Sequence, residues 1–422
     1  MNLKLSSWFK AQQKINKINI SFVDFPNIKN WTANNNEIFH NSKKFFKIIG
    51  VKVKTNFYKK NWDQPIILQN EIGILGILKN LKNNKYLLQA KVEPGNINKL
   101  QFSPTVQATK SNYNQVHGGK KVPYLDYFLN IKKKINHNQS EQGFRYFNKL
   151  NSNILVGIKK NIKFKQGFIW VSLAQLCEMV RRKNLLNMDT LSVVSSNISL
   201  NKIDNSINKL KAIDQWIKKR DKSFFLKSSI IPLSKLKDWQ YDKKSIMHKN
   251  KKHFSIIGIK IKTNKREINE WSQPILKGKN LAIAGFIIKK INNTNHYLCR
   301  YILKPGLKKS ALTCTANSSD LKRYKQDNNL STFQKNIIGN YFLNKDLKKY
   351  KIYDNIMSDE GGRFFHCQIR YIGLTLNENS KINLPSNYIW ISHNQMVGLI
   401  KNKKIDIEAR LLFGSLNIDK LK

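Results

Sequence analysis

Acidic residues are scarce in this sequence: 26 Asp and Glu stand against 76 Lys and Arg in 422 residues, a formal net charge of +50. Such a balance normally points to nucleic acid or an anionic membrane. Here Lys is accompanied by many Asn and Ile residues, which indicates drift toward A/T-rich codons on solvated surfaces. We therefore expect no nucleic acid and no membrane partner, and keep a basic nucleic-acid-binding protein as an alternative. A basic surface would also attract a pyrophosphate-bearing ligand.

Cysteine is rare as well, and long apolar runs are missing. Cys177, Cys299, Cys314 and Cys367 lie in apolar stretches without CxxC spacing, which predicts reduced core thiols rather than a disulfide framework. No run approaches the roughly eighteen apolar residues of a membrane helix, and the N-terminus lacks the apolar core of a secretion signal. We therefore expect a cytoplasmic protein that does not span a membrane.

Familiar catalytic signatures are also missing. The sequence has no P-loop, no G-x-G-x-x-G after a strand, no G-x-S-x-G and no H-E-x-x-H. The 8 histidines are scattered, so no metal site is expected. The composition is nevertheless that of a folded protein, with 41% hydrophobic and 11% aromatic residues. We expect a globular protein without a cofactor.

The clearest feature that is present is an internal repeat. The matched pairs of segments are 45–56 with 253–264, 62–66 with 271–275, 85–95 with 296–306, 140–145 with 358–363, and 168–176 with 388–396. The numbering offset grows only from 208, at Asn56 and Asn264, to 220, at Trp170 and Trp390. Five matches in one order with small gaps indicate a tandem duplication.

Each copy has the pattern of mixed α and β structure. Ile48–Lys54 alternates apolar and basic residues, as a half-buried strand does. Leu87–Glu93 is a second strand, ended by the turn signal Pro94-Gly95. Ser172 is placed to cap a helix that follows it. Many strands with few helices favour the α+β class over a doubly wound sheet.

The copies divide the chain into two modules. We expect a first module at 1–205 and a second at 206–422, with a polar linker from about 197 to 211. Each module is expected to open with a helical lead-in, at 1–17 in the first copy and at 211–239 in the second. We expect the first module to be the active one, because of its polar residues.

The densest polar motif is QAKVEPGNINKLQFSPTVQATKSNY, from Gln89 to Tyr113. Strand alternation places Gln89, Lys91 and Glu93 on one face. An acid and an amine two residues apart suit the wall of a wet pocket. A solvent-facing strand surface with a weak ion pair would produce the same pattern, so both interpretations stay open at this point.

The second copy does not keep this face. The corresponding residues are Arg300, Ile302 and Lys304, and the stretch PTVQATKSNY aligns with LTCTANSSDL, without counterparts for Gln107 and Tyr113. One copy thus keeps a polar group of residues that the fold itself does not require. We therefore assign the working pocket to the first copy.

A later motif shows the opposite asymmetry. The second copy has Glu360 where the first has Gln142, whereas Arg145 and Arg363 are present in both. The two arginines are candidates for phosphate clamps, or they satisfy turns. His117, on a predicted loop, is either a ligand contact or a solvated side chain.

These motifs resemble the NDP-hexose 2,3-dehydratase family. The resemblance rests on WDQPI at 62–66, QAKVEPGN at 89–96, SPTVQAT at 103–109, SNY at 111–113, SEQG at 140–143 and EGGRF at 360–364, and it spans nearly the whole chain. It implies a tandem pair of Nudix-like modules, usually a homodimer, acting on dTDP-4-keto-6-deoxyglucose without a metal. The hydrolytic Nudix box is missing. Lys304-Pro305-Gly306 departs from the family's E-P-G pattern, which leaves open whether the second copy binds a nucleotide.

The implied reaction needs a base for the C3 proton, an acid for the departing C2 hydroxyl and a partner for the enolate oxygen. From residue chemistry we expect Glu93 as base or acid, with Glu360 as its rival, and Lys91 or Tyr113 at the enolate. The expected substrate contacts are Gln89, Asn96, Gln107, Thr109, Asn112, His117, Arg145 and Arg363. The product would pass to a sugar ketoreductase. An inactive sugar-nucleotide-binding subunit is a further alternative.

Overall fold

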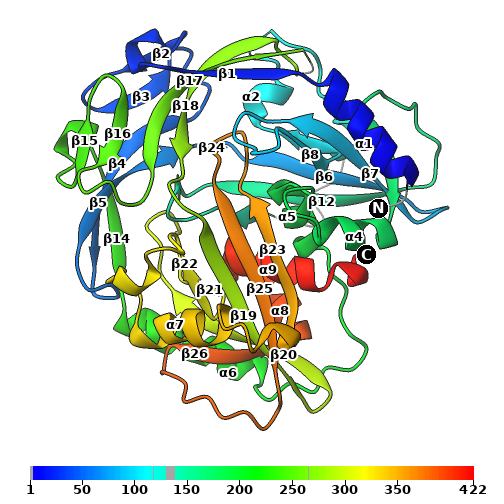
Figure 1. The fold of residues 1–422 in the computed structure, drawn as a ribbon, viewed down its shortest axis with the longest axis vertical. Helices are drawn as coiled ribbons and strands as arrows, with labels where there is room; N and C mark the ends of the chain where they lie inside the picture. The colour runs from blue at the N-terminus through cyan, green and yellow to red at the C-terminus, as the bar shows by residue number, and fades with distance from the viewer. Residues whose placement is uncertain (1–2, 117, 130–137, 265) are drawn as a thin grey trace.

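The structure, a computed structural model, describes residues 3–116, 118–129, 138–264 and 266–422 (Figure 1). The first copy comprises α1 (Leu3–Ile15), β1 (Ile18–Val23), β2 (Trp31–Ala33), β3 (Glu37–His40), β4 (Lys47–Thr55), β5 (Trp62–Leu68), β6 (Gly73–Asn80), β7 (Lys85–Val92), β8 (Leu100–Pro104), β9 (Val106–Ala108), α2 (Lys110–Tyr113), α3 (Asp126–Leu129), β10 (Asn138–Ser140), β11 (Tyr146–Phe147), β12 (Leu150–Ile158), β13 (Phe168–Ser172), α4 (Leu173–Val180) and α5 (Met188–Ser196).

The second copy follows the same order of elements with small differences. It comprises α6 (Leu210–Ser223), β14 (Leu226–Ile231), β15 (Trp239–Tyr241), β16 (Ser245–His248), β17 (Ser255–Thr263), β18 (Glu270–Lys277), β19 (Ala282–Ile291), β20 (Thr294–Ile302), β21 (Ala311–Thr313), β22 (Ala316–Ser318), α7 (Thr332–Asn336), β23 (Lys351–Ser358), β24 (Phe364–Phe365), β25 (Gln368–Leu376), β26 (Tyr388–Ser392), α8 (His393–Lys401) and α9 (Ile407–Leu416).

The sheets repeat as the sequence does. One large sheet has the strand order β10-β12-β6-β7-β13, and its counterpart in the second copy has the order β23-β25-β19-β20-β26. Parallel and antiparallel pairs occur in both, for example the parallel pair β12–β6 and the antiparallel pair β6–β7. Mixed sheets with few helices confirm the α+β class, and the repeated strand order matches the duplication.

Most elements lie where the residue pattern predicts them. β4 and β7 confirm the two expected strands, and Ser172 caps α4, accepting a hydrogen bond from the backbone N–H of Gln175. The helical lead-in of the second copy is shorter than predicted. Helix α6 ends at Ser223 and the chain continues as β14, because the segment LKSSII ends in β-branched residues that favour a strand.

The two copies exchange their leading strands. β1, from the first copy, pairs antiparallel with β17 of the second, and β14, from the second copy, pairs antiparallel with β4 of the first. Figure 1 shows β1 lying beside β17. Each smaller sheet is therefore completed by a strand of the other copy, which holds the copies in a fixed relation.

The largest hydrophobic core also crosses between the copies. Helices α5 and α9 pack against each other at the centre of the molecule (Figure 1). A Cβ at Gly414 would lie 2.7 Å from Ser195 Cβ, so glycine allows the helices to approach closely. Val193 and Leu412, on these helices, are fully buried. The N-termini of α5 and α9 thereby reach the seam between the copies.

Two further expectations concern the cysteines and the membrane. Cys299, Cys314 and Cys367 are buried, Cys177 is partly buried, and all four are free, as predicted for core thiols. Within the part of the chain that the structure describes, no helix is long and apolar enough to cross a membrane.

Candidate active site

The acid and the amine of the first-copy motif lie in the interior. Lys91 and Glu93, at the end of β7, are 6% and 2% exposed. Lys91 Nζ lies 3.9 Å from Glu93 Oε1 and donates to the Gln107 carbonyl oxygen at 3.1 Å. Gln107 Nε2 donates to Glu93 Oε1 at 2.9 Å. A solvent-facing strand surface is therefore the wrong interpretation of this motif.

The turn after Glu93 packs directly on the second copy. Gly95 N–H donates to the Gly361 carbonyl at 2.7 Å, and His366 N–H donates to the Gly95 carbonyl at 2.8 Å. A Cβ at Gly95 would lie 1.8 Å from the Phe364 carbonyl oxygen, so only glycine permits this backbone approach. The end of β7 and the turn before β24 thus form one unit across the seam.

This contact brings Glu360 beside Glu93. A Cβ at Gly362 would lie 3.2 Å from Glu360 Oε1 and 3.8 Å from Glu93 Oε1, so both carboxylates approach the same glycine. The two opposite asymmetries of the sequence therefore describe one composite site. The first copy contributes Glu93 and the second copy contributes Glu360.

Sequence reasoning missed Tyr146. Its hydroxyl donates to Glu360 Oε2 at 2.5 Å, again across the seam. Tyr146 corresponds to Phe364 in the second copy, and Glu360 corresponds to Gln142, so this hydroxyl–carboxylate pair occurs once in the duplicated fold. A single tyrosine at the start of a strand forms no recognisable motif. Only the difference between Tyr146 and Phe364 at this position could have identified Tyr146 from the sequence.

Two more buried carboxylates, Glu141 and Asp189, belong to the same group. Burial, and then the nearby Glu360, raise the pKa of Glu141 to about 7. Burial followed by Glu360, Glu141 and Glu93 raises the pKa of Asp189 well above its usual range. Burial also raises the pKa of Glu360, with Arg363 opposing it. The Glu141 carboxyl therefore changes protonation near neutral pH, and the raised pKa values of Asp189 and Glu360 favour their protonated forms, so an acid and a base can coexist at short range.

The cations of the site have weakened affinity for protons. Burial, followed by the charge of Arg266, lowers the pKa of Lys91, and Glu93 only partly opposes this. Arg266 lies in the loop between β17 and β18 and donates to the Val92 carbonyl at 3.0 Å. Burial likewise lowers the pKa of Lys149. An amine of this kind can donate a hydrogen bond to a developing oxyanion and can also release a proton.

Arg145 and Arg363 have different surroundings. Arg145 is ion-paired with the buried Asp359 of the other copy, so the turn-satisfying alternative describes it better than a phosphate clamp. Arg363 stacks on the Phe46 ring, 4.1 Å from its centroid. Among the described residues, no carboxylate lies within ion-pair distance of Arg363 and its Nε has no hydrogen-bond partner. Arg363 therefore remains available to an anionic ligand.

In the second copy the corresponding position is closed by ion pairs. Lys304, the counterpart of Glu93, is 2% exposed and lies 2.8 Å from Asp406 Oδ2 and 2.6 Å from Glu408 Oε2. These acids belong to the first turn of α9, where α5 has Asn187 and Asp189. The positive charge of Lys304 is thus neutralised by Asp406 and Glu408, and both acids are ion-paired with its amine.

The structure corrects the alignment of the stretch after β8. The Thr105 hydroxyl donates to the Leu87 carbonyl, and the Thr315 hydroxyl makes the same bond in the second copy, to Leu298. Thr105 therefore corresponds to Thr315, an offset of 210, and not to Thr313. By this register, Gln107 corresponds to Asn317. The second copy therefore keeps a side-chain amide at this position, on a side chain one methylene shorter.

The other expected contacts fall into two regions. Gln89 is half-buried on β7, and Asn96 is buried at the seam, where its side-chain amide has no hydrogen-bond partner among the described residues. Thr109, Asn112 and Tyr113 lie instead at helix α2. His117 lies outside the described residues. The structure thus gathers Lys91, Glu93, Asn96, Gln107, Glu360 and Arg363, and the α2 residues follow Gln107 along the chain without a hydrogen bond to these groups within the described part of the chain.

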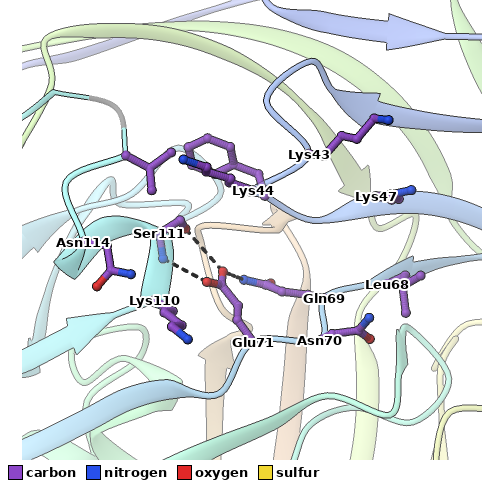
Figure 2. Close-up of a pocket in the computed structure, with 12 residues that line it drawn as sticks. Lys43, Lys44, Lys47, Leu68, Gln69, Asn70, Glu71, Lys110, Ser111 and Asn114 are labelled. Atoms are coloured by element: carbon purple, nitrogen blue, oxygen red, sulfur yellow. Dashed lines mark hydrogen bonds between the residues drawn. The ribbon is translucent and has the colours of Figure 1, made fainter.

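Beside α2 lies a hollow of about 340 Å³, which we call the lysine pocket (Figure 2). Its lining residues are Lys43, Lys44, Phe45, Lys47, Leu68, Gln69, Asn70, Glu71, Lys110, Ser111, Asn114 and Val116. Glu71 accepts hydrogen bonds from the Ser111 N–H at 2.9 Å and from Gln69 Nε2 at 2.8 Å. In residues 3–116, 118–129, 138–264 and 266–422, no group of three or more His, Cys, Asp and Glu side chains is arranged to hold a metal ion.

A buried set of coupled acids and cations is the arrangement of enzymes that move protons on a substrate. The family model for NDP-hexose 2,3-dehydratase matches residues 2–196 and 210–416. The chain belongs to this family. It is 30% identical to a dTDP-4-dehydro-6-deoxy-α-D-glucopyranose 2,3-dehydratase of Streptomyces violaceoruber, over 96% of this chain and 95% of that protein. Proteins of the same name from Saccharopolyspora spinosa and Amycolatopsis orientalis are 29% and 28% identical, each over 97% of this chain and over 90% and 89% of their own lengths.

Proposed function

We propose that this protein eliminates water across C2 and C3 of dTDP-4-keto-6-deoxyglucose and releases a 3,4-diketo-2,6-dideoxy sugar nucleotide. The names of the relatives support the substrate. The observation that carries the chemistry is the composite site, in which the carboxylates of Glu93 and Glu360 both approach Gly362. Such a site supplies a base and an acid to adjacent carbons of one hexose.

The steps follow from the substrate's own chemistry. The C4 ketone acidifies the C3 proton; a carboxylate removes it, and the electron pair moves onto the C4 oxygen as an enolate. The enolate then expels the C2 hydroxyl, which leaves as water after protonation by an acid. The resulting C3 enol tautomerises to the ketone. One of Glu93 and Glu360 is the base and the other is the acid. Replacing each residue separately shows which is which.

Hydrogen bonds to the enolate oxygen complete the proposed site. Lys91 and Tyr113 are the two candidates, and Lys91 is preferred because it lies within 3.9 Å of Glu93 whereas Tyr113 belongs to the α2 region. A buried cation beside a developing oxyanion lowers the barrier by several kcal/mol in comparable sites. The proposed substrate contacts are Gln89, Asn96, Gln107, Thr109, Asn112 and Arg363. Of the two arginines, Arg363 is the proposed pyrophosphate contact, because Arg145 is ion-paired with Asp359.

We further propose the setting in which the site works. The repeated strand order supports two modules, at 1–205 and 206–422. The family resemblance supports a Nudix-like fold for each. The family resemblance supports a cytoplasmic homodimer that passes its product to a sugar ketoreductase. The elimination itself transfers no electrons, so the reaction balances without a redox cofactor.

The test is a coupled assay on the purified chain. dTDP-4-keto-6-deoxyglucose is incubated with the protein and with a ketoreductase and its reductant, which trap the diketone, and loss of one water is followed by mass spectrometry. Glu93→Gln and Glu360→Gln should each lower turnover by roughly 10²–10⁴. The variant that lacks the base should also lose exchange of the C3 proton with solvent deuterium. The variant that lacks the acid should keep this exchange. Unchanged turnover in both variants would refute the assignment.

A further inference from the structure

The lysine pocket holds positive charge that the protein does not neutralise. The amines of Lys43, Lys44 and Lys110 are exposed, and no acidic group of the described residues lies within ion-pair distance of them. Lys47 is paired, with its Nζ 2.8 Å from Glu37 Oε1. Figure 2 shows the lysines arranged around the hollow. An anion in this hollow would therefore meet several cations from different segments.

The one carboxylate in the lining is committed to the scaffold. Both oxygens of Glu71 accept hydrogen bonds, from the Ser111 backbone and the Gln69 amide, and its carbonyl oxygen accepts from Lys149 Nζ at 2.5 Å. These bonds hold α2 against the loop between β5 and β6. The shape of the pocket is thus determined by internal contacts, while the amines of Lys43, Lys44 and Lys110 have no acidic partner among the described residues.

Surface lysines alone are weak evidence for a binding site in a chain of net charge +50. The duplication, however, allows the pocket residues to be compared with their counterparts in the second copy. At the offset of 208, Lys47 corresponds to Ser255, and at the offset of 210, Lys110 corresponds to Asp320. Asp320 Oδ2 accepts a hydrogen bond from Asn280 Nδ2 at 2.8 Å, so the second copy has an acid where the first has a cation. Lys43 and Lys44 keep lysine counterparts, Lys251 and Lys252, so the difference in charge between the copies lies at Lys47 and Lys110.

The pocket is connected to the composite site through two neighbouring contacts. Phe45 lines the pocket, and the next residue, Phe46, carries the Arg363 guanidinium on its ring. Lys149 bonds to Glu71 on the pocket side, and its charge also acts on Glu360. These contacts make the lysine pocket a neighbour of the composite site.

We propose that the lysine pocket binds the diphosphate of the nucleotide sugar, and that the hexose extends from it past Arg363 toward Glu360; this rests on the proposed function. A sugar-nucleotide diphosphate carries about two negative charges, which the unpaired lysines match. Phe45, Leu68 and Val116 offer apolar surface to the nucleobase. The charge difference at Lys110 then favours the first-copy pocket over its counterpart in the second copy, where Asp320 stands.

The test uses thymidine diphosphate as the probe and isothermal titration of the full-length protein, so it needs no turnover. Lys110→Asp introduces the charge of the second copy and should raise the dissociation constant at least about tenfold, with a smaller rise of roughly threefold for Lys44→Ala. The matched control is Lys252→Ala, the counterpart of Lys44 in the second copy, which should change affinity less than about twofold. Equal affinity of Lys110→Asp and the unaltered protein would overturn the proposal.

Competition and DNA binding provide two further tests. Inorganic pyrophosphate should compete with thymidine diphosphate, and its binding should show the same sensitivity to Lys110→Asp; competition without that sensitivity would overturn the proposal. Weakened binding of a DNA duplex in Lys110→Asp, with thymidine diphosphate binding unchanged, would likewise overturn it in favour of a nucleic-acid contact. If thymidine diphosphate binding depends on Lys110 but no water is lost from the sugar, the proposed reaction fails and the pocket assignment stands.

Discussion

Replacing Tyr146 with Phe is predicted to move the pH profile of the reaction upward. The Tyr146 hydroxyl donates to Glu360 Oε2 at 2.5 Å, while its ring packs edge-on against Phe364 with centroids 5.4 Å apart. Phe keeps the ring and this packing and removes only the hydroxyl. The second copy already has a phenyl ring at the corresponding position, Phe364, so the fold accommodates the change.

The size of the shift follows from the hydrogen bond. Burial raises the pKa of Glu360, and Arg363 and the Tyr146 hydroxyl lower it in part. A hydrogen bond to a charged group contributes about 1.5–3 kcal/mol, and one pKa unit corresponds to about 1.4 kcal/mol. Loss of the hydroxyl disfavours the charged carboxylate, so the pKa of Glu360 should rise by about one to two units.

The assay is the initial rate of dehydration between about pH 5 and pH 10. If Glu360 is the base, the limb on which activity rises with pH moves upward; if it is the acid, the falling limb moves upward. Tyr353→Phe is the control, because that hydroxyl donates to the Val180 carbonyl at 2.9 Å in the core. The control should lose stability without moving either limb. Superimposable profiles for Tyr146→Phe and the unaltered enzyme would refute the role of the hydroxyl.

Three further predictions concern the seam. Because burial raises the pKa of Glu141 to about 7, the folded state binds more protons than the unfolded state between its ordinary pKa and pH 7, and stability falls as pH rises. Glu141→Gln should therefore be more stable than the unaltered protein at pH 8, by up to roughly 3 kcal/mol in denaturant titrations, and similar at pH 4; a pH-independent difference would contradict this. Lys304→Met should cost about 3–5 kcal/mol by leaving Asp406 and its neighbouring acid buried without a cation, and an unchanged denaturation midpoint would argue against the ion pairs. Gly95→Ala should abolish dehydration and lower the melting temperature, because its Cβ would lie 1.8 Å from a backbone oxygen of the other copy; full activity would show that the seam is not required.

The duplication and the positions of most strands could be predicted from residue order alone. Apolar alternation at Ile48–Lys54 and the turn signal after Leu87–Glu93 are local properties, and local backbone preference agrees with the final fold there. The same holds for Ser172, whose capping bond joins residues three positions apart. The lead-in of the second copy was overestimated because β14 is stabilised by pairing with a distant strand.

The site depended on contacts that no local pattern contains. Comparison of the copies singled out Glu93 and Glu360 separately, but their proximity results from the backbone approach of Gly95 to Gly361, which lie in different copies. Arg145 and Arg363 occupy equivalent positions of the repeat. Arg145 is ion-paired with the buried Asp359, whereas Arg363 has no such partner among the described residues. Side-chain chemistry identified the candidates, and packing between the copies decided which of them lie together. Burial and distance then set the proton affinities on which the chemistry depends.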